Sequence, residues 1–152
     1  NLTQLSQLSI GSLLVIQPST ALEEGLKAIA QNLKLLTVLD LSGKGQNDLD
    51  IKAVGTTIED IAKGLPLLTE LGIGSWFASS LGDCCTGEAG AVSIARNLSQ
   101  LEKLDTRAFG PGDKINMTGA LALAMNLPSL SELIVCTDHL TQRETISETG
   151  PH

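Results

Sequence analysis

The residues best suited to chemistry in this chain are three cysteines and a histidine. Cys84 and Cys85 are adjacent, and Cys136 begins a Cys-x-x-His arrangement that ends at His139. Thiolate and imidazole are the usual ligands of structural zinc. A single tetrahedral site would require the segment around Cys84 to fold across the long stretch before Cys136. We therefore expect ordinary loop or buried thiols here, and no metal site.

Nucleophilic and phosphate-binding chemistry also lack a supporting motif. His139 is the only non-terminal histidine, and no oxyanion-hole motif accompanies it. The segment Gly43-Lys44-Gly45 has neither the glycine spacing nor the following Ser/Thr of a phosphate loop. The sequence thus predicts a protein that is not an enzyme and that takes no metal and no small-molecule cofactor.

Composition narrows the class of partner. The net charge of −7 and the pI near 4.7 argue against nucleic acid, because phosphate neutralisation needs a clustered basic surface. No apolar run is long enough to span a membrane, so no membrane partner is expected. Hydrophobic residues make up 42% but aromatic residues only 2%, which is typical of a core built from repeated aliphatic layers. Three cysteines cannot all pair, which favours a reducing, cytoplasmic location.

One leucine spacing recurs along the chain at nearly even intervals. The pattern is Leu-x-x-Leu-x-x-Leu-x-aliphatic, and its copies start at Leu2, Leu33, Leu65, Leu98 and Leu127, with Thr106 as the last residue of the fourth copy. The alternating end of each copy predicts short parallel strands near 8–10, 39–41, 71–73, 104–106 and 133–135. Helical segments are expected between them, near 20–31, 57–63, 88–96 and 118–125. Residues 1–136 are thus predicted to form one repeat array, and 137–152 a polar tail or incomplete cap.

Each predicted helix ends at an Asn or Gly that is followed at once by Leu. These exit residues are Asn32, Gly64, Asn97 and Asn126, for which we expect a left-handed conformation. An alanine stands two positions earlier (Ala30, Ala62, Ala95, Ala124), where its small size is expected to let the helix approach the sheet. Asn1-Leu2 has the form of an exit, which predicts at least one further repeat upstream.

The segments Gly90-Ala-Val-Ser-Ile-Ala-Arg-Asn-Leu98 and Gly119-Ala-Leu-Ala-Leu-Ala-Met-Asn-Leu127, with the leucines after them, resemble ribonuclease-inhibitor-type leucine-rich repeats. The resemblance implies an α/β solenoid, a right-handed superhelix with an inner parallel sheet of about five short strands and outer helices. The family's asparagine-ladder positions are occupied here by Leu13, Lys44, Trp76, Phe109 and Asp138. This departure resembles the C-terminal repeats of NOD-like immune receptors.

Two surfaces are candidate binding sites. On the concave sheet, Asp40, Glu70, Asp105 and Glu132, with Lys103 among them, are predicted to form a mildly acidic strip. This strip is either a docking surface for basic residues of a protein or an ordinary solvated face. In the loops after the strands, Trp76 and Phe109 are expected to pack inward, whereas Phe77 and Arg107 are candidate partner contacts.

The resemblance implies a non-enzymatic recognition module of an innate-immune receptor that senses a ligand or keeps the receptor inactive. Its partner would be a protein ligand or another domain of the same parent protein. The alternative is a stand-alone inhibitor or scaffold that binds an enzyme or signalling protein with the same surface.

Overall fold

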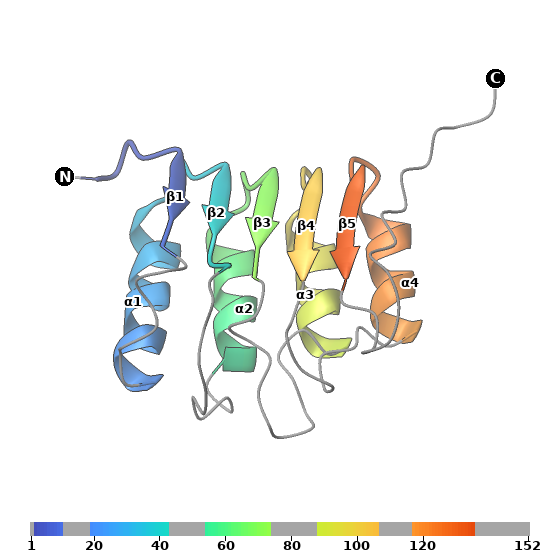
Figure 1. Cartoon of the computed structure of the whole chain (residues 1–152), viewed down its shortest axis with the longest axis horizontal. Coiled ribbons are helices and arrows are strands. Elements are labelled where there is room, and N and C mark those ends of the chain that lie inside the picture. Colours follow the sequence, from blue (N-terminus) through green and yellow to red (C-terminus); the bar gives the residue numbers. More distant parts are fainter. Residues whose placement is uncertain (1, 11–18, 43–53, 74–87, 107–116, 136–152) are drawn as a thin grey trace.

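The computed structural model describes residues 2–10, 19–42, 54–73, 88–106 and 117–135. Strands and helices alternate along this part of the chain. The strands are β1 (Gln7–Ser9), β2 (Val38–Asp40), β3 (Glu70–Gly72), β4 (Lys103–Thr106) and β5 (Glu132–Val135). The helices are α1 (Ser19–Asn32), α2 (Val54–Gly64), α3 (Glu88–Asn97) and α4 (Met117–Asn126). The protein is therefore α/β, with all five described strands in one sheet (Figure 1).

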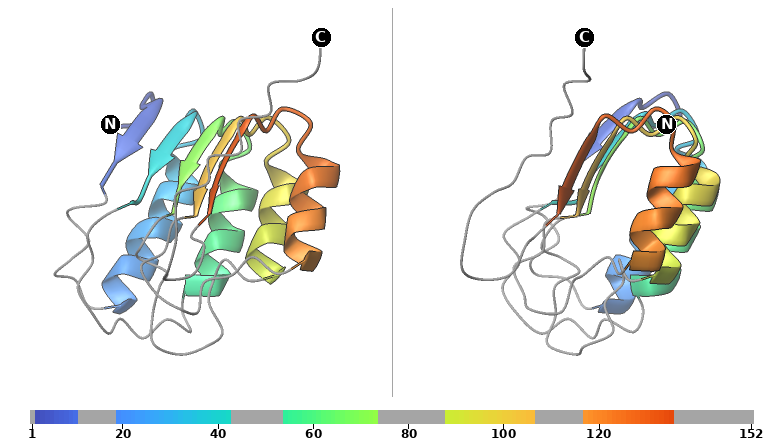
Figure 2. Two further views of the ribbon diagram at one scale, coloured as in Figure 1. Left: turned by 45° about the vertical axis from the view of Figure 1, so that its right-hand side comes forward. Right: turned by 90° about the vertical axis from the view of Figure 1, so that its right-hand side faces the viewer.

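The sheet is parallel throughout, and its strands follow one another in sequence order from β1 to β5. Residues at the same place in the leucine pattern pair across it. One such row of paired positions runs Leu8, Leu39, Leu71, Leu104, Leu133. The four helices form a second layer against one face of the sheet (Figure 2). β1, β2 and β3 lie one residue earlier than the sequence predicts, because the last aliphatic of the pattern, such as Leu41 or Ile73, follows the strand as a buried residue. β4 and β5 begin one residue earlier but end where the sequence predicts.

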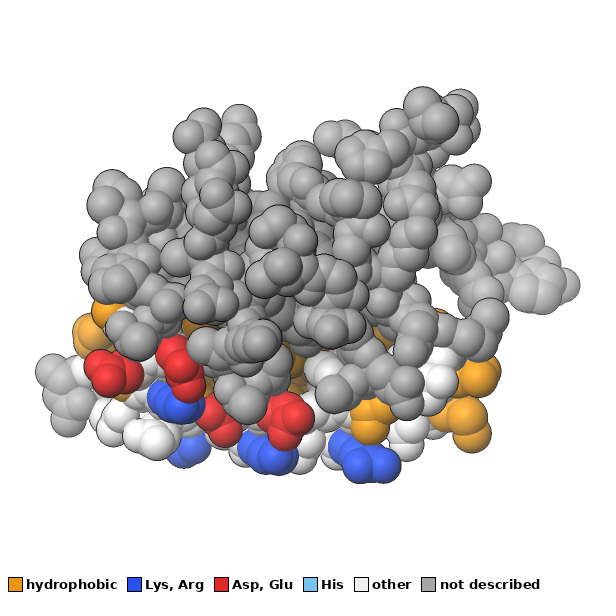
Figure 3. Space-filling view, turned by 90° about the horizontal axis from the view of Figure 1, so that it is seen from below, with side chains coloured by type: hydrophobic (Ala, Val, Ile, Leu, Met, Phe, Trp, Pro, Cys, Tyr) orange, Lys and Arg blue, Asp and Glu red, His pale blue; other side chains and the backbone are white. Residues whose placement is uncertain are grey.

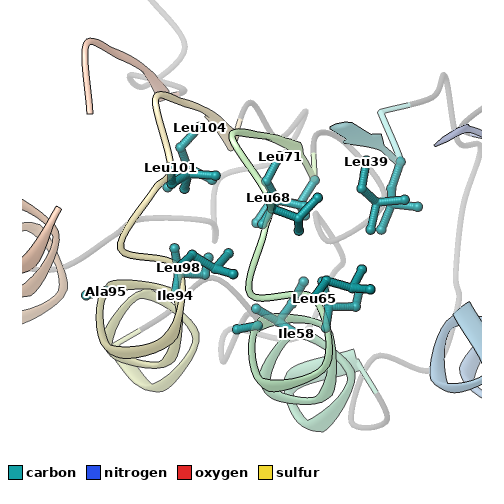
Figure 4. Close-up of a cluster of buried hydrophobic side chains, with 14 of the residues drawn as sticks. Leu39, Ile58, Leu65, Leu68, Leu71, Ile94, Ala95, Leu98, Leu101 and Leu104 are labelled. Atoms are coloured by element: carbon teal, nitrogen blue, oxygen red, sulfur yellow. The ribbon is translucent and has the colours of Figure 1, made fainter. Parts of the chain in front are cut away.

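The core lies between the two layers and is almost entirely aliphatic. Leucines of the strands and turns point toward aliphatic side chains of the helices (Figure 4). Leu36, Leu68 and Leu101 are fully buried, as are Ile58 and Ile61 of α2. The scarcity of aromatic residues is thus explained, because branched aliphatic side chains fill the layers repeatedly.

The helices end where the sequence predicts, but the geometry of the exit differs from the expectation. Gly64 does not adopt a left-handed conformation; its missing side chain instead allows close approach, since a Cβ there would lie 2.6 Å from the carbonyl oxygen of Ala30. At the other exits, the side-chain amides of Asn32, Asn97 and Asn126 each donate a hydrogen bond of 2.8 Å to the carbonyl four residues earlier. Each amide thereby adds a side-chain hydrogen bond to the last turn of its helix.

The predicted role of the alanines is also wrong. Ala30 lies against Gly64 of the neighbouring helix, and Ala95 lies on the side of α3 that faces α4 (Figure 4). These two alanines therefore face a neighbouring helix. Ala124 of α4 is exposed, because no described helix lies beyond it.

On the outer side of the helices, two ion pairs join residues four positions apart. Lys27 donates to Glu23, and Lys63 to Glu59 at 3.1 Å. The hydrogen bond from Lys27 to Glu23 raises the pKa of that lysine. None of the described helices is long and apolar enough to cross a membrane.

Candidate functional site: the open face of the sheet

One face of the sheet is not covered by any described helix, and we call it the open face. Its side chains come from two rows of positions that alternate with the buried leucines. The first row runs Ser9, Asp40, Gly72, Asp105, Ile134, and the second runs Gln7, Val38, Glu70, Lys103, Glu132. Each row follows from strand alternation, because the residues on either side of a core leucine point away from the core.

Asp40 is held in place by its neighbours in the first row. Its Oδ1 accepts a hydrogen bond of 2.8 Å from the backbone N–H of Ser42, and its Oδ2 accepts one of 3.3 Å from the Ser9 hydroxyl. On the other side stands Gly72, where a Cβ would lie 2.7 Å from Oδ1 of Asp40. The glycine therefore makes room for the carboxylate, and the two hydrogen bonds orient it.

A hollow lies at the centre of the open face, and Gly72 is one of the residues that line it. Its volume is about 400 Å³, and residues of β1 to β4 line it. Asp40 and Ser42 lie on one side of Gly72, while Glu70 and Lys103 belong to the adjacent row. The volume falls in the range of pockets that accept a small ligand or a large side chain.

The second row carries charges of both signs. Lys103 lies between Glu70 and Glu132 in the strand register, and its Nζ forms a salt bridge of 3.2 Å with Glu132. The predicted acidic strip is thus two rows, in which Lys103 separates the two glutamates. Asp40 and Glu70 are the more accessible of the carboxylates that line the hollow.

Asp105 occupies its predicted row but is much less accessible than its neighbours. Only 8% of the residue is exposed, compared with the half-buried Asp40. Thr106, directly after it, is also buried, and its hydroxyl donates to the carbonyl of Ile134 at 3.2 Å. A partner would reach Asp105 only through the hollow that it helps to line.

The structure brings together the five sheet residues predicted from the sequence: Asp40, Glu70, Lys103, Asp105 and Glu132. The two predicted loop contacts, Phe77 and Arg107, lie outside the described residues. So do the asparagine-ladder positions and the residues considered as zinc ligands, Cys84, Cys85, Cys136 and His139.

Sequence reasoning missed the function of Gly72 and of Ser9 and Ser42. A glycine within an otherwise regular row of side chains was the available signal, since glycine in a strand often marks close approach of another group. The serines gave no such signal, because serine is common on any solvated surface.

No protein-family model matches the chain, and no curated protein matches it either. Its function is therefore argued from the geometry of the open face.

Proposed function

We propose that this chain is a non-enzymatic recognition module that binds a protein on its open face and receives a basic side chain in the hollow over Gly72. The observation that supports it most directly is the fixed carboxylate of Asp40 at the edge of that hollow. A carboxylate already oriented by two hydrogen bonds loses little freedom on binding an ammonium or guanidinium group. Glu70, which is exposed in the adjacent row, adds a second negative charge.

The fold that we propose for the complete module is a ribonuclease-inhibitor-type leucine-rich-repeat solenoid, a right-handed α/β superhelix. Three observations support it: the sequential order of the parallel strands, one helix between each pair of strands, and the recurrence of leucines at the same register. Such arrays bind partners on extended surfaces formed by many units. The open face, with contributions from β1 to β5, is a surface of that kind.

Within this class, we propose the repeat domain of a cytoplasmic NOD-like immune receptor, which binds a protein ligand or another domain of its parent. The support is the resemblance carried by Gly90–Leu98 and Gly119–Leu127 together with the acidic open face. Sequencing the gene upstream of residue 1 tests the assignment. A nucleotide-binding domain encoded there agrees with a receptor, whereas its absence from the full-length gene leaves the stand-alone inhibitor or scaffold.

Site-specific photo-crosslinking tests the binding surface itself. A photoreactive amino acid is placed either at Val38, which lines the hollow, or at Gln31, which is exposed on α1 in the helix layer. Both variants are irradiated in extract, and the crosslinked proteins are identified by mass spectrometry. We expect a defined partner at position 38 whose crosslinked peptide contains Lys or Arg, and no such product at position 31.

Two results count against the proposal. If both positions give the same products, the open face has no preference over the helix layer. If the partner crosslinks only from position 31, the binding surface lies on the helices.

A further inference from the structure

Lys103 brings a positive charge to the place where the proposed function puts the basic group of a partner. Among the described residues that line the hollow it is the only lysine or arginine, while Asp40, Glu70 and Asp105 supply carboxylates. An ammonium group of the chain itself therefore competes with the partner's basic group for the same carboxylates. The affinity of the hollow for a cation then depends on where the ammonium group of Lys103 is held.

The strand register gives Lys103 a glutamate neighbour on each side. Glu70 of β3 and Glu132 of β5 are both paired with it in the sheet. Neighbouring strands lie about 4.8 Å apart, so the flexible stem of a lysine can bring its ammonium group to either carboxylate. Glu70 lines the hollow, whereas Glu132 does not. The choice between the two glutamates therefore decides whether the ammonium group occupies the acidic site.

In the structure, Lys103 pairs with the glutamate that lies outside the hollow. Its Nζ is 3.2 Å from Oε2 of Glu132, and the described residues show no ion pair between Lys103 and Glu70. Both side chains of the pair are 40% exposed, and ion pairs as exposed as this are weak. The pairing with Glu132 is therefore a modest preference, and removal of that carboxylate leaves Glu70 as the acidic neighbour of Lys103.

We propose that Glu132 is a positioning residue that holds the ammonium group of Lys103 away from Glu70 and so keeps the hollow open to a partner's basic group. The inference rests on the proposed function, since it concerns a cation bound at the same carboxylates. Without Glu132, Lys103 pairs with Glu70 and repels an incoming cation at short range. The apparent affinity for that cation falls in proportion to the fraction of molecules in which the site is still free.

NMR spectroscopy of the isotopically labelled full chain tests the position of Lys103 and the binding of a cation together. The probe is Nα-acetyl-arginine amide, whose only charge is the guanidinium group, and Nα-acetyl-citrulline amide is the uncharged control. In wild type, we expect the backbone amide signals of Ser42 and Gly72 to shift with the arginine probe and not with the control. Nuclear Overhauser effects from Hε of Lys103 should reach Hγ of Glu132 in wild type, and Hγ of Glu70 in Glu132→Gln.

A double-mutant cycle separates positioning by Glu132 from the effect of its charge alone. Glu132→Gln should weaken binding of the arginine probe about 2- to 5-fold, as expected for loss of a weak ion pair that holds Lys103 aside. Lys103→Met should bind the probe more tightly than wild type. In that background, Glu132→Gln should change the affinity by less than about 1.5-fold, because no ammonium group is left to turn toward Glu70.

Glu59→Gln is the matched control on the helix layer. The Glu59 side chain is 39% exposed and pairs with Lys63, so the substitution removes an equally accessible carboxylate from the same kind of pair. Acidic and basic side chains of this layer are neighbours at the surface (Figure 3). This variant should leave binding of the arginine probe unchanged.

The amide spectrum shows directly whether each variant is folded, and Glu132→Ala is a second variant at the same position. An equal loss of affinity on Glu132→Gln in both backgrounds, with the contacts of Lys103 unchanged, overturns the inference but leaves the proposed function intact. If the arginine probe shifts no signal at the hollow in wild type or in Lys103→Met, the hollow accepts no basic group, and the proposed function fails together with the inference.

Discussion

Asp40 and Gly72 depend on each other across neighbouring strands. The Oδ1 atom of Asp40 occupies the space into which a side chain at position 72 would extend, 2.7 Å from an ideal Cβ. The same Oδ1 accepts the backbone N–H of Ser42. The glycine therefore leaves the space in which the carboxylate of Asp40 is held.

Replacing Gly72 with Ala should change the stability of the protein only slightly. The added Cβ meets only the ends of two side chains, Asp40 and Ser42, which can rotate away. Loss of their hydrogen bonds should cost about 1 kcal/mol, offset in part by the lower unfolded-state entropy of alanine. Urea denaturation should therefore give a free energy of unfolding within about 1 kcal/mol of wild type. A loss of several kcal/mol would mean that Gly72 supports the backbone and does not merely make room for Asp40.

Two helical glycines should respond to alanine with opposite signs. At Gly64, a Cβ would meet the backbone of Ala30, which cannot move without shifting α1, so Gly64→Ala should destabilise the protein by about 1–3 kcal/mol. At Gly25, the Cβ meets nothing, so Gly25→Ala should stabilise it by about 0.5–1 kcal/mol through helix propensity. Thermal unfolding of both variants at a concentration where the chain is monomeric checks the pair. Equal effects would contradict the close packing of α1 on α2.

Lys34 should contribute more to stability than a typical surface lysine. Its Nζ donates to the carbonyl of Ala30 at 2.6 Å and to that of Gly64 at 2.8 Å, so one ammonium group joins the C-terminal ends of α1 and α2. Lys34→Met should lower the free energy of unfolding by about 1 kcal/mol. Lys63→Met removes a lysine that pairs with Glu59 on the surface, and it should cost no more than about 0.5 kcal/mol. Urea denaturation of both variants should therefore show a larger loss of the free energy of unfolding for Lys34→Met than for Lys63→Met. The reverse order would contradict the bridging role of Lys34.

Buried and exposed leucines of the repeated pattern should contribute differently to the free energy of unfolding. Leu71 is 1% exposed at the centre of the sheet, so Leu71→Ala should cost about 2–5 kcal/mol. Leu67, in the turn before the same strand, is 37% exposed. Leu67→Ala should cost well under half as much, because little apolar surface returns to water. Chemical denaturation that showed a near-neutral Leu71→Ala would place this leucine outside the core.

The sequence predicts most of the fold because the same constraint acts several times. Each strand must bury its leucine while exposing the residues on both sides, so Leu39, Leu71 and Leu104 identify the strands and the open-face rows together. Helix ends are predicted well, because Asn and Gly are strong stop signals. The predicted positions of β1, β2 and β3 are one residue late, since Leu41 and Ile73 follow their strands but are still buried and still donate backbone hydrogen bonds to the next strand.

The contacts that join neighbouring units could not be predicted in this way. The approach of Gly64 to Ala30, the bridge from Lys34 and the pairing of Lys103 with Glu132 all depend on how one unit is placed against the next. Periodicity within a unit carries no information about that placement. The same reason explains why the alanines were assigned to the sheet and not to the neighbouring helix.

In the proposed complex, a partner's basic group binds the carboxylates of Asp40 and Glu70 on the open face. Its most direct test is the dissociation constant of the crosslinked partner for two double variants that remove the same charge. Asp40→Asn with Glu70→Gln neutralises the open face, whereas Glu24→Gln with Asp60→Asn neutralises carboxylates of α1 and α2. We expect binding to weaken by about 10- to 100-fold for the first pair and by less than about 2-fold for the second. Equal weakening, or loss only in the second pair, would contradict recognition on the open face.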